Sequence, residues 1–167
     1  MMLGFAAMPS PIGTIEYFFD SKALLALEFE DDGNRTRAWL ARRFGDIEIK
    51  PMTDKLGIGR RLARYFAGDH RALDEIPTRG DGTPFQEEIW SALRRIPTGQ
   101  TTTYGALAAA IGRPGAQRAV GAANGANPIA IVVPCHRVIG HGGKLTGYGG
   151  GLDRKEWLLR HEGAILC

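Results

Sequence analysis

The pattern of hydrophobic and polar residues predicts a strand-rich beginning to the chain. Segments 11–20 (PIGTIEYFFD) and 23–30 (ALLALEFE) are rich in β-branched, aromatic and aliphatic side chains, and polar residues separate them. This composition predicts two strands of an antiparallel pair joined by a short turn. The apolar spacing farther along predicts helices over 35–44 and 57–69 and a short strand over 46–50.

A polar segment rich in glycine and proline, residues 74–84, separates this region from a better-defined helix. Thr83 is a candidate N-cap, Pro84 suits the first helical position, and Gln86 completes a capping box. Apolar residues then recur at helical spacing and predict a helix with one face in a core; they are Phe85, Ile89, Leu93 and Ile96.

Two short helices with a glycine-containing break between them are predicted next. Residues 104–112 (YGALAAAIG) form the first, residues 116–124 (AQRAVGAAN) form the second, and GRPG lies between them. This spacing is typical of a helix-turn-helix, although an αα-hairpin packed in a core fits the pattern equally well. The second helix favours DNA binding, because small side chains allow close approach to a duplex and a long basic one stands near its start. These residues are Arg118, Ala119, Gly121 and Ala122.

Together these elements predict a mixed α/β (α+β) fold in two domains. We expect residues 1–80 to form a small N-terminal lobe, an antiparallel sheet with helices. We expect residues 81–167 to form a mostly helical C-terminal domain that contains the helix-turn-helix and the PCHR motif at 134–137.

Composition excludes several classes of protein. The chain has 167 residues, 44% hydrophobic and 23% charged, and no apolar run approaches the roughly 18 residues of a membrane span, so we expect no membrane partner. No basic residue precedes the short apolar patch at the N-terminus, so we expect no secretory signal. With two cysteines, no CxxC pair and four scattered histidines, we expect no disulfide scaffold, no metal and no other cofactor. A cytoplasmic location follows, with Cys167 an exposed and dispensable thiol.

The positive charge of the chain is concentrated in its second half. The net charge is +3 overall, but residues 1–81 hold 12 Lys and Arg against 13 Asp and Glu, whereas residues 82–167 hold 9 against 5. A basic second half fits a polyanionic partner, although an excess of this size is weak evidence alone.

The sequence IVVPCHRVIG, residues 131–140, places a cysteine, a histidine and an arginine directly after a proline. A single cysteine is most often a small buried hydrophobic residue. A reactive cysteine needs a lowered thiol pKa, which a cation, a helix N-terminus or a base can supply. His136 adjoins Cys135, but neighbours on an extended segment point to opposite sides, so a contact through water is easier than a direct one. Glu162, near the end of the amphipathic segment 151–163, is a candidate acid to orient the imidazole.

Residues 96–163 resemble the catalytic domain of O6-alkylguanine-DNA alkyltransferases, which are suicide repair proteins. The resemblance is almost unbroken and rests on PCHRV at 134–138, Asn-Pro at 127–128 and His-Glu at 161–162. It implies irreversible, single-turnover transfer of the alkyl group of O6-alkylguanine in double-stranded DNA to Cys135, with the target base flipped out. O4-alkylthymine as a second lesion is left open. We expect a monomer, and cooperative assembly along DNA is left open.

The resemblance also implies roles for individual residues. Cys135 would be the alkyl acceptor, His136 would deprotonate it through a water, and Glu162 would hold the histidine. Asn127 would brace the turn that presents the PCHR segment. Tyr104 would press on the phosphate backbone of the target nucleotide and protonate the departing guanine at N3.

The same resemblance implies DNA contacts and a substrate pocket. Arg118 would enter the duplex as a finger that fills the space of the extruded base. Tyr148 would close one wall of the pocket, and the backbone N–H of Gly149 would face guanine O6. Many relatives have serine at this last position, so glycine keeps the donor with less stiffness. Pro134 and Val138 complete the predicted pocket.

Two other functions compete with alkyl transfer. The chain fits a non-catalytic helix-turn-helix module that binds DNA lesions, but such relatives lack the cysteine nucleophile, which is present here. A Cys-His-Glu hydrolase would need an oxyanion hole and would turn over repeatedly, and the sequence has no motif for either.

Overall fold

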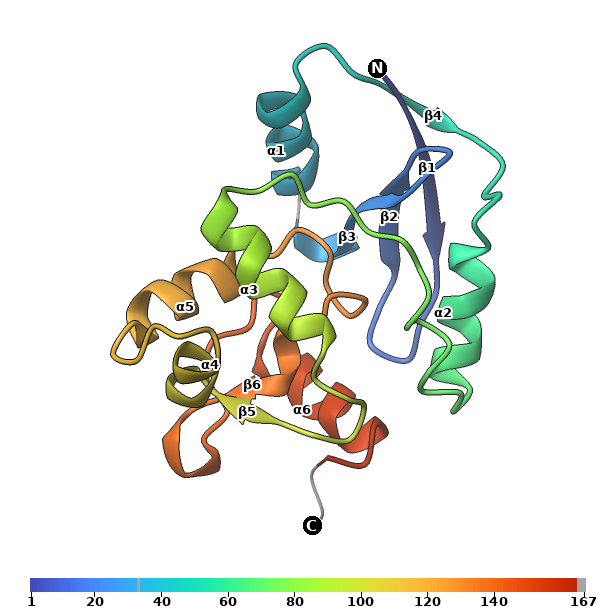
Figure 1. Cartoon of the computed structure of the whole chain (residues 1–167). Coiled ribbons are helices and arrows are strands. Elements are labelled where there is room, and N and C mark those ends of the chain that lie inside the picture. Colours follow the sequence, from blue (N-terminus) through green and yellow to red (C-terminus); the bar gives the residue numbers. More distant parts are fainter. Residues whose placement is uncertain (33, 165–167) are drawn as a thin grey trace. The chain divides into compact units, whose positions relative to one another are not determined.

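The computed structural model describes residues 1–32 and 34–164, which form two compact units (Figure 1). The first unit comprises Met1–Asp81 with Pro128–Ala130, and the second comprises Gly82–Asn127 with the residues from Ile131 onward. Cys167 lies outside the described residues, so its expected exposure stays a prediction. None of the helices in the described part of the chain has the length and apolar character needed to cross a membrane.

The first unit is built on a four-stranded sheet with the strand order β3-β2-β1-β4. The strands are β1 (Met2–Met8), β2 (Ile15–Phe19), β3 (Leu24–Phe29) and β4 (Glu48–Pro51). The predicted antiparallel pairing of β2 with β3 is confirmed. The sheet as a whole is mixed rather than purely antiparallel, because β1 pairs antiparallel with β2 but parallel with β4.

A helix covers each face of this sheet (Figure 1). The helices are α1 (Arg35–Phe44) and α2 (Ile58–Phe66), and a 3-10 turn, η1 (Glu30–Asp32), precedes α1. Leu40 of α1 packs with Phe18 of β2, whereas the preceding residue of the strand, Tyr17, reaches Gly59 of α2. Because successive residues of a strand point to opposite faces, the two helices bury opposite sides of the sheet.

Residues 128–130 belong to the first unit, although the sequence pattern assigns them to the second. The backbone N–H of Leu27 donates to the carbonyl of Pro128 at 3.0 Å, and the N–H of Ala130 donates to the carbonyl of Leu27 at 3.2 Å. This isolated bridge adds the segment to the β3 edge of the sheet.

The second unit is mostly helical, as predicted. Its helices are α3 (Pro84–Arg94), α4 (Tyr104–Ala110), α5 (Gln117–Gly125) and α6 (Leu152–His161). Its 3-10 turns are η2 (Cys135–Arg137) and η3 (His141–Gly143). Two short parallel strands, β5 (Thr102–Thr103) and β6 (Val138–Ile139), connect the start of α4 to the segment that follows the PCHR motif.

The capping box predicted for α3 is confirmed. The Thr83 hydroxyl accepts from the backbone N–H of Gln86 at 3.2 Å, and the Gln86 side chain accepts from the N–H of Thr83 at 2.9 Å. Ile89 and Leu93 are completely buried, and the indole of Trp90 donates to the carbonyl of Ala123 at 2.8 Å. The helix start is thus fixed locally, and α3 is joined to α5 by a buried hydrogen bond.

The two short helices with a turn between them are confirmed as α4 and α5. The Thr103 hydroxyl caps α4 by accepting from the N–H of Ala106 at 3.0 Å. The turn contains Gly112 and Gly115 with φ of 77° and 88°, left-handed values that glycine adopts without a steric penalty. At the crossing, a Cβ on Gly121 would lie 3.8 Å from the Tyr104 ring, an ordinary van der Waals distance, so Gly121 faces Tyr104 but the packing does not require glycine there.

Candidate active site

A strained loop and a 3-10 turn present Cys135. The N–H of Cys135 donates to the carbonyl of Val133 at 2.8 Å, and the N–H of Arg137 donates to the carbonyl of Pro134 at 3.0 Å. Ile131, four residues earlier, adopts φ of 69°, a value that a β-branched residue takes only when its surroundings impose it. The Asn127 amide donates to the carbonyl of Val133 at 2.8 Å. This hydrogen bond joins Asn127 to the residue two positions before Cys135.

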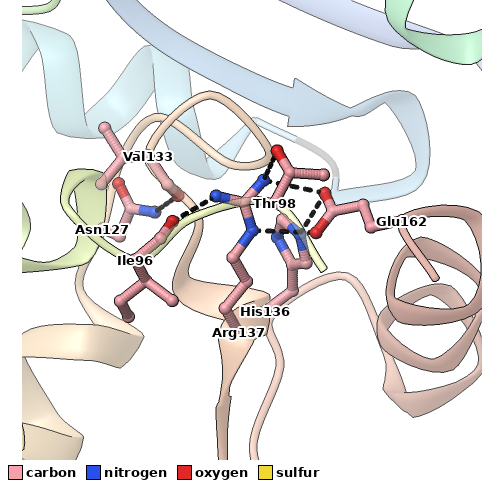
Figure 2. Close-up of polar contacts among 7 residues, drawn as sticks. All are labelled: Ile96, Thr98, Asn127, Val133, His136, Arg137 and Glu162. Atoms are coloured by element: carbon pink, nitrogen blue, oxygen red, sulfur yellow. Dashed lines mark hydrogen bonds and ion pairs between the residues drawn. The ribbon is translucent and has the colours of Figure 1, made fainter. Parts of the chain in front are cut away.

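His136 and Glu162 form a buried pair (Figure 2). The His136 Nε2 lies 2.9 Å from Glu162 Oε2, and both side chains are completely buried. Glu162, the candidate acid in the sequence, therefore contacts the His136 imidazole directly. Because a carboxylate only accepts, the hydrogen lies on Nε2, and Nδ1 carries the free lone pair of the neutral imidazole. Nδ1 has no hydrogen-bond partner within residues 1–32 and 34–164.

Arg137 turns this pair into a network. Its Nε donates to Glu162 Oε1 at 2.8 Å, and its Nη2 donates to Glu162 Oε2 at 3.1 Å. The rest of the guanidinium reaches backbone and hydroxyl acceptors, the carbonyl of Ile96 at 2.7 Å and Thr98 Oγ1 at 3.2 Å (Figure 2). Arg137 thus fixes the turn and the end of α6 together.

The electrostatics of this network suit a base. Burial alone would raise the pKa of Glu162, but His136 and Arg137 outweigh it and hold that pKa well below its usual range. Burial lowers the pKa of His136, and the attraction of Glu162 opposes the shift without reversing it. The imidazole is therefore neutral near pH 7 and free to accept a proton at Nδ1.

The Cys135 thiol is buried, with 8% of the residue exposed. Burial raises the pKa of this thiol, while a hydrogen bond from Asn127 and the positive charge of Lys155 act in the opposite direction. The Asn124 amide of α5 also donates to the carbonyl of Cys135, at 3.4 Å. The thiol thus needs a base to become a thiolate, and Asn127 and Lys155 favour the thiolate once it forms.

Lys155 is the site residue that sequence reasoning missed. It is completely buried, and its ammonium donates to carbonyls of Val138 and Thr146, each at 2.6 Å. A lysine in the segment GLDRKEWLL is expected to be exposed, but the buried residues of this region fall at positions 155, 158, 159 and 162. That i, i+3, i+4, i+7 spacing is the signal that places Lys155 on the same buried face as Glu162.

The structure brings some of the predicted pocket residues together. Tyr104 begins α4, and its hydroxyl donates to the carbonyl of Thr146 at 3.2 Å. The Tyr148 ring stands edge-on to the His136 ring, with centroids 6.5 Å apart. Of the other residues predicted for the pocket, Pro134 and Val138 are buried and Gly149 is exposed.

Four of the predicted DNA-contacting residues lie on α5 outside the buried network, and the fifth, Tyr104, begins α4. Arg118, Ala119 and Ala122 are exposed, and Gly121 is half-buried against Tyr104. This side of the helix therefore offers an arginine beside a surface with little side-chain bulk.

Comparisons with known proteins agree with this arrangement. Residues 84–164 match a family model described as "6-O-methylguanine DNA methyltransferase, DNA binding domain". The chain is 53% identical over 160 residues to the methylated-DNA–protein-cysteine methyltransferase of Salmonella typhimurium, covering 94% of each chain. It is 57% identical over 160 residues to the protein of the same name from Methanosarcina acetivorans, covering 96% of this chain and 98% of that one. The crystal structure of Mycobacterium tuberculosis OGT in complex with DNA superposes with a TM-score of 0.80 at 40% identity, covering 98% of this chain and 94% of that one.

Proposed function

The chain belongs to the methylated-DNA–protein-cysteine methyltransferase family, and we propose that Cys135 accepts the alkyl group of O6-alkylguanine in duplex DNA. The protein is a DNA repair enzyme that transfers an alkyl group from DNA to its own cysteine. The observation that supports Cys135 is its position beside the buried His136–Glu162 pair. Cys135 is also the one free cysteine among the described residues.

The chemistry begins with removal of the thiol proton. His136 Nδ1 takes this proton through a water, and Glu162 stabilises the imidazolium that results. The thiolate attacks the alkyl carbon in line, a sulfur–carbon bond forms, and the bond from that carbon to guanine O6 breaks. The electron pair passes to guanine, which accepts a proton at N3 from Tyr104 and a hydrogen bond at O6 from the N–H of Gly149. The thioether has no leaving route, so each molecule reacts once.

The lesion lies inside a stacked base pair, so the nucleotide must leave the duplex before it can react. The exposed small residues of α5 allow close approach to a groove, and Arg118 occupies the space of the extruded base. The Tyr148 ring beside His136 forms one wall of the pocket that receives the base.

We further propose that the protein acts in the cytoplasm, where a reducing environment keeps the nucleophilic thiol free. We propose a monomer in the absence of DNA. Binding isotherms on duplexes of increasing length test for cooperative assembly along DNA. Reaction with a duplex that contains O4-alkylthymine tests for repair of that lesion.

The defining experiment measures intact mass before and after incubation with O6-benzylguanine, followed by peptide mapping. We expect one benzyl group per chain, located on Cys135, and no further turnover. A Cys167→Ser variant is the matched control and should take up the same single group. A duplex that contains O6-methylguanine supplies a smaller substrate if benzyl is too large for the pocket. A protein unmodified by both substrates would instead be the non-catalytic lesion-binding module, and repeated turnover of an ester or amide would indicate the hydrolase.

Replacement of Arg118 by alanine should separate DNA repair from the chemistry. We expect repair of an O6-methylguanine duplex to slow about tenfold. Holding a base outside the duplex costs a few kcal/mol, and losing about 1.4 kcal/mol of the stabilisation that offsets this cost corresponds to a factor of ten. Reaction with free O6-benzylguanine should keep its rate. Single-turnover rates on the two substrates measure this, and Arg160→Ala, which removes an exposed arginine from α6, is the control. Equal losses on both substrates would contradict the finger role.

A further inference from the structure

Arg113 is an exposed arginine in the turn between α4 and α5. Its carbonyl accepts from the backbone N–H of Ala116 at 3.1 Å, directly before α5 begins at Gln117. The side chain therefore leaves the chain at the N-terminal end of α5, the end that also carries Arg118. In a helix-turn-helix, the N-terminal end of the second helix is the part that lies against the duplex.

Helix α3 holds the Arg113 guanidinium in place. The guanidinium carbon lies over the Phe85 ring, 5.3 Å from its centroid, and Nη2 lies 3.6 Å from Glu88 Oε2. Phe85 and Glu88 are three residues apart, so they share one face of α3. The buried hydrogen bond from Trp90 to Ala123 joins α3 to α5. The arginine is thus oriented by the fold before any ligand binds.

The ion pair with Glu88 leaves the donors of Arg113 available. A distance of 3.6 Å is longer than an N–H···O hydrogen bond, so the carboxylate attracts the cation without occupying its N–H groups. The Arg113 side chain is 56% exposed and the Glu88 side chain is 40% exposed, so water and salt screen the attraction. A guanidinium can bind a phosphate through two parallel N–H groups, which makes a stronger contact than this ion pair.

We propose that Arg113 binds a phosphate of the DNA backbone beside α5, and that Glu88 competes with this phosphate for the guanidinium. This deepens the proposed function, because it rests on duplex DNA lying against the exposed side of α5. A phosphate contact carries no sequence information, so Arg113 strengthens binding to any duplex. Glu88 weakens this sequence-independent binding and so shortens the time that the protein spends on undamaged DNA.

Binding to an undamaged duplex at several salt concentrations tests the phosphate contact. Each neutralised phosphate contributes about 0.9 to the steepness of log K against log [salt]. In Arg113→Gln we expect the steepness to fall by about 0.9 and the affinity at 0.1 M salt to fall about eightfold, the factor that this slope gives between 1 M and 0.1 M. Arg113→Lys keeps the charge and should restore the slope. A parent slope in Arg113→Gln would overturn the contact.

The competition is tested with Glu88→Gln, alone and combined with Arg113→Gln. Removing the carboxylate should raise the affinity for undamaged duplex about threefold at 0.1 M salt, the size expected for an exposed ion pair. In the Arg113→Gln background most of this gain should disappear, because no guanidinium remains for Glu88 to hold. An equal gain in both backgrounds would mean that Glu88 only repels DNA in general, and would overturn the competition.

Arg160 and Glu156 of α6 are the matched control pair, because they form an ion pair at 2.8 Å and are exposed to a similar degree. Arg160→Gln and Glu156→Gln change the net charge by the same amounts as the test variants, and each should change the affinity less than about twofold. Effects as large as those at Arg113 and Glu88 would assign the result to net charge and overturn the proposal. These measurements need no alkyl transfer, so a protein that fails to take up benzyl would refute the proposed function while this test still stands.

Discussion

The Cys135→Ser protein will bind duplex DNA and transfer no alkyl group. A hydroxyl is a far weaker acid and nucleophile than a thiol, and His136, reached through a water, cannot make up the difference. We expect the single-turnover rate to fall by at least about 10³-fold, beyond detection in a standard assay. Affinity for undamaged duplex should stay within about twofold, because phosphate contacts dominate it and Cys135 is buried.

The measurement is transfer of a labelled methyl group from an O6-methylguanine duplex to protein, with a gel-shift titration on the same samples. Cys167→Ser serves as the matched control and should transfer the label at the parent rate. Residual transfer by Cys135→Ser at more than a few hundredths of the parent rate would place the acceptor on another residue. Loss of DNA binding along with transfer would show that the substitution damages the fold.

Most of the second unit could be predicted from the sequence because its signals are local. The α3 cap is encoded within four residues, from Thr83 to Gln86, and the left-handed turn between α4 and α5 is marked by glycines. The residues alone made Glu162 a candidate to orient His136, and the resemblance to a known family implied the same pairing; spacing alone does not join residues so far apart. The structure supplies the reason for the pairing, because Glu162 ends the buried stripe of α6 that faces the PCHR turn.

The features that escaped prediction depend on long-range pairing. Strand β1 contains Gly4, Ala6 and Ala7, residues with little intrinsic preference for strands. It becomes a strand because β2 and β4 pair with it on both sides. The segment 128–130 joins the first unit through Leu27, a hydrogen-bonded partner that local patterning cannot reveal. The strained φ of Ile131 directly follows this bridge.

Arg137 shows how far residue identity alone can go. A guanidinium can donate several hydrogen bonds at once, but the acceptors that Arg137 uses, on Ile96, Thr98 and Glu162, come from two distant parts of the chain. The consequence is that Glu162 serves two partners at once. The carboxylate orients the base and balances a buried guanidinium, so its loss should affect stability as well as rate.

Glu162→Gln should therefore lower both the free energy of unfolding and the rate of alkyl transfer. Glutamine has the same shape and can still accept from His136 Nε2, but it leaves Arg137 as a buried cation without its anion. Removing one partner of such a pair costs about 3 kcal/mol. We also expect the rate to fall about 100-fold, because the imidazolium formed when His136 accepts the thiol proton loses its stabilising charge. Urea unfolding and single-turnover transfer of benzyl measure the two effects.

Glu156→Gln is the matched control, since Glu156 lies on the same helix and pairs with Arg160 at the surface. Its unfolding free energy should change by less than about 0.5 kcal/mol.

The difference in unfolding free energy between the parent and Glu162→Gln should also depend on pH. The pKa of Glu162 is lower in the folded protein than in the unfolded chain, so this carboxylate contributes its full stability above the unfolded value of about 4.3. As the pH falls below that value, the unfolded chain takes up a proton that the folded protein does not, and the difference should narrow. A difference that stays constant from pH 7 to pH 3 would mean that packing, rather than the charge of Glu162, stabilises the turn.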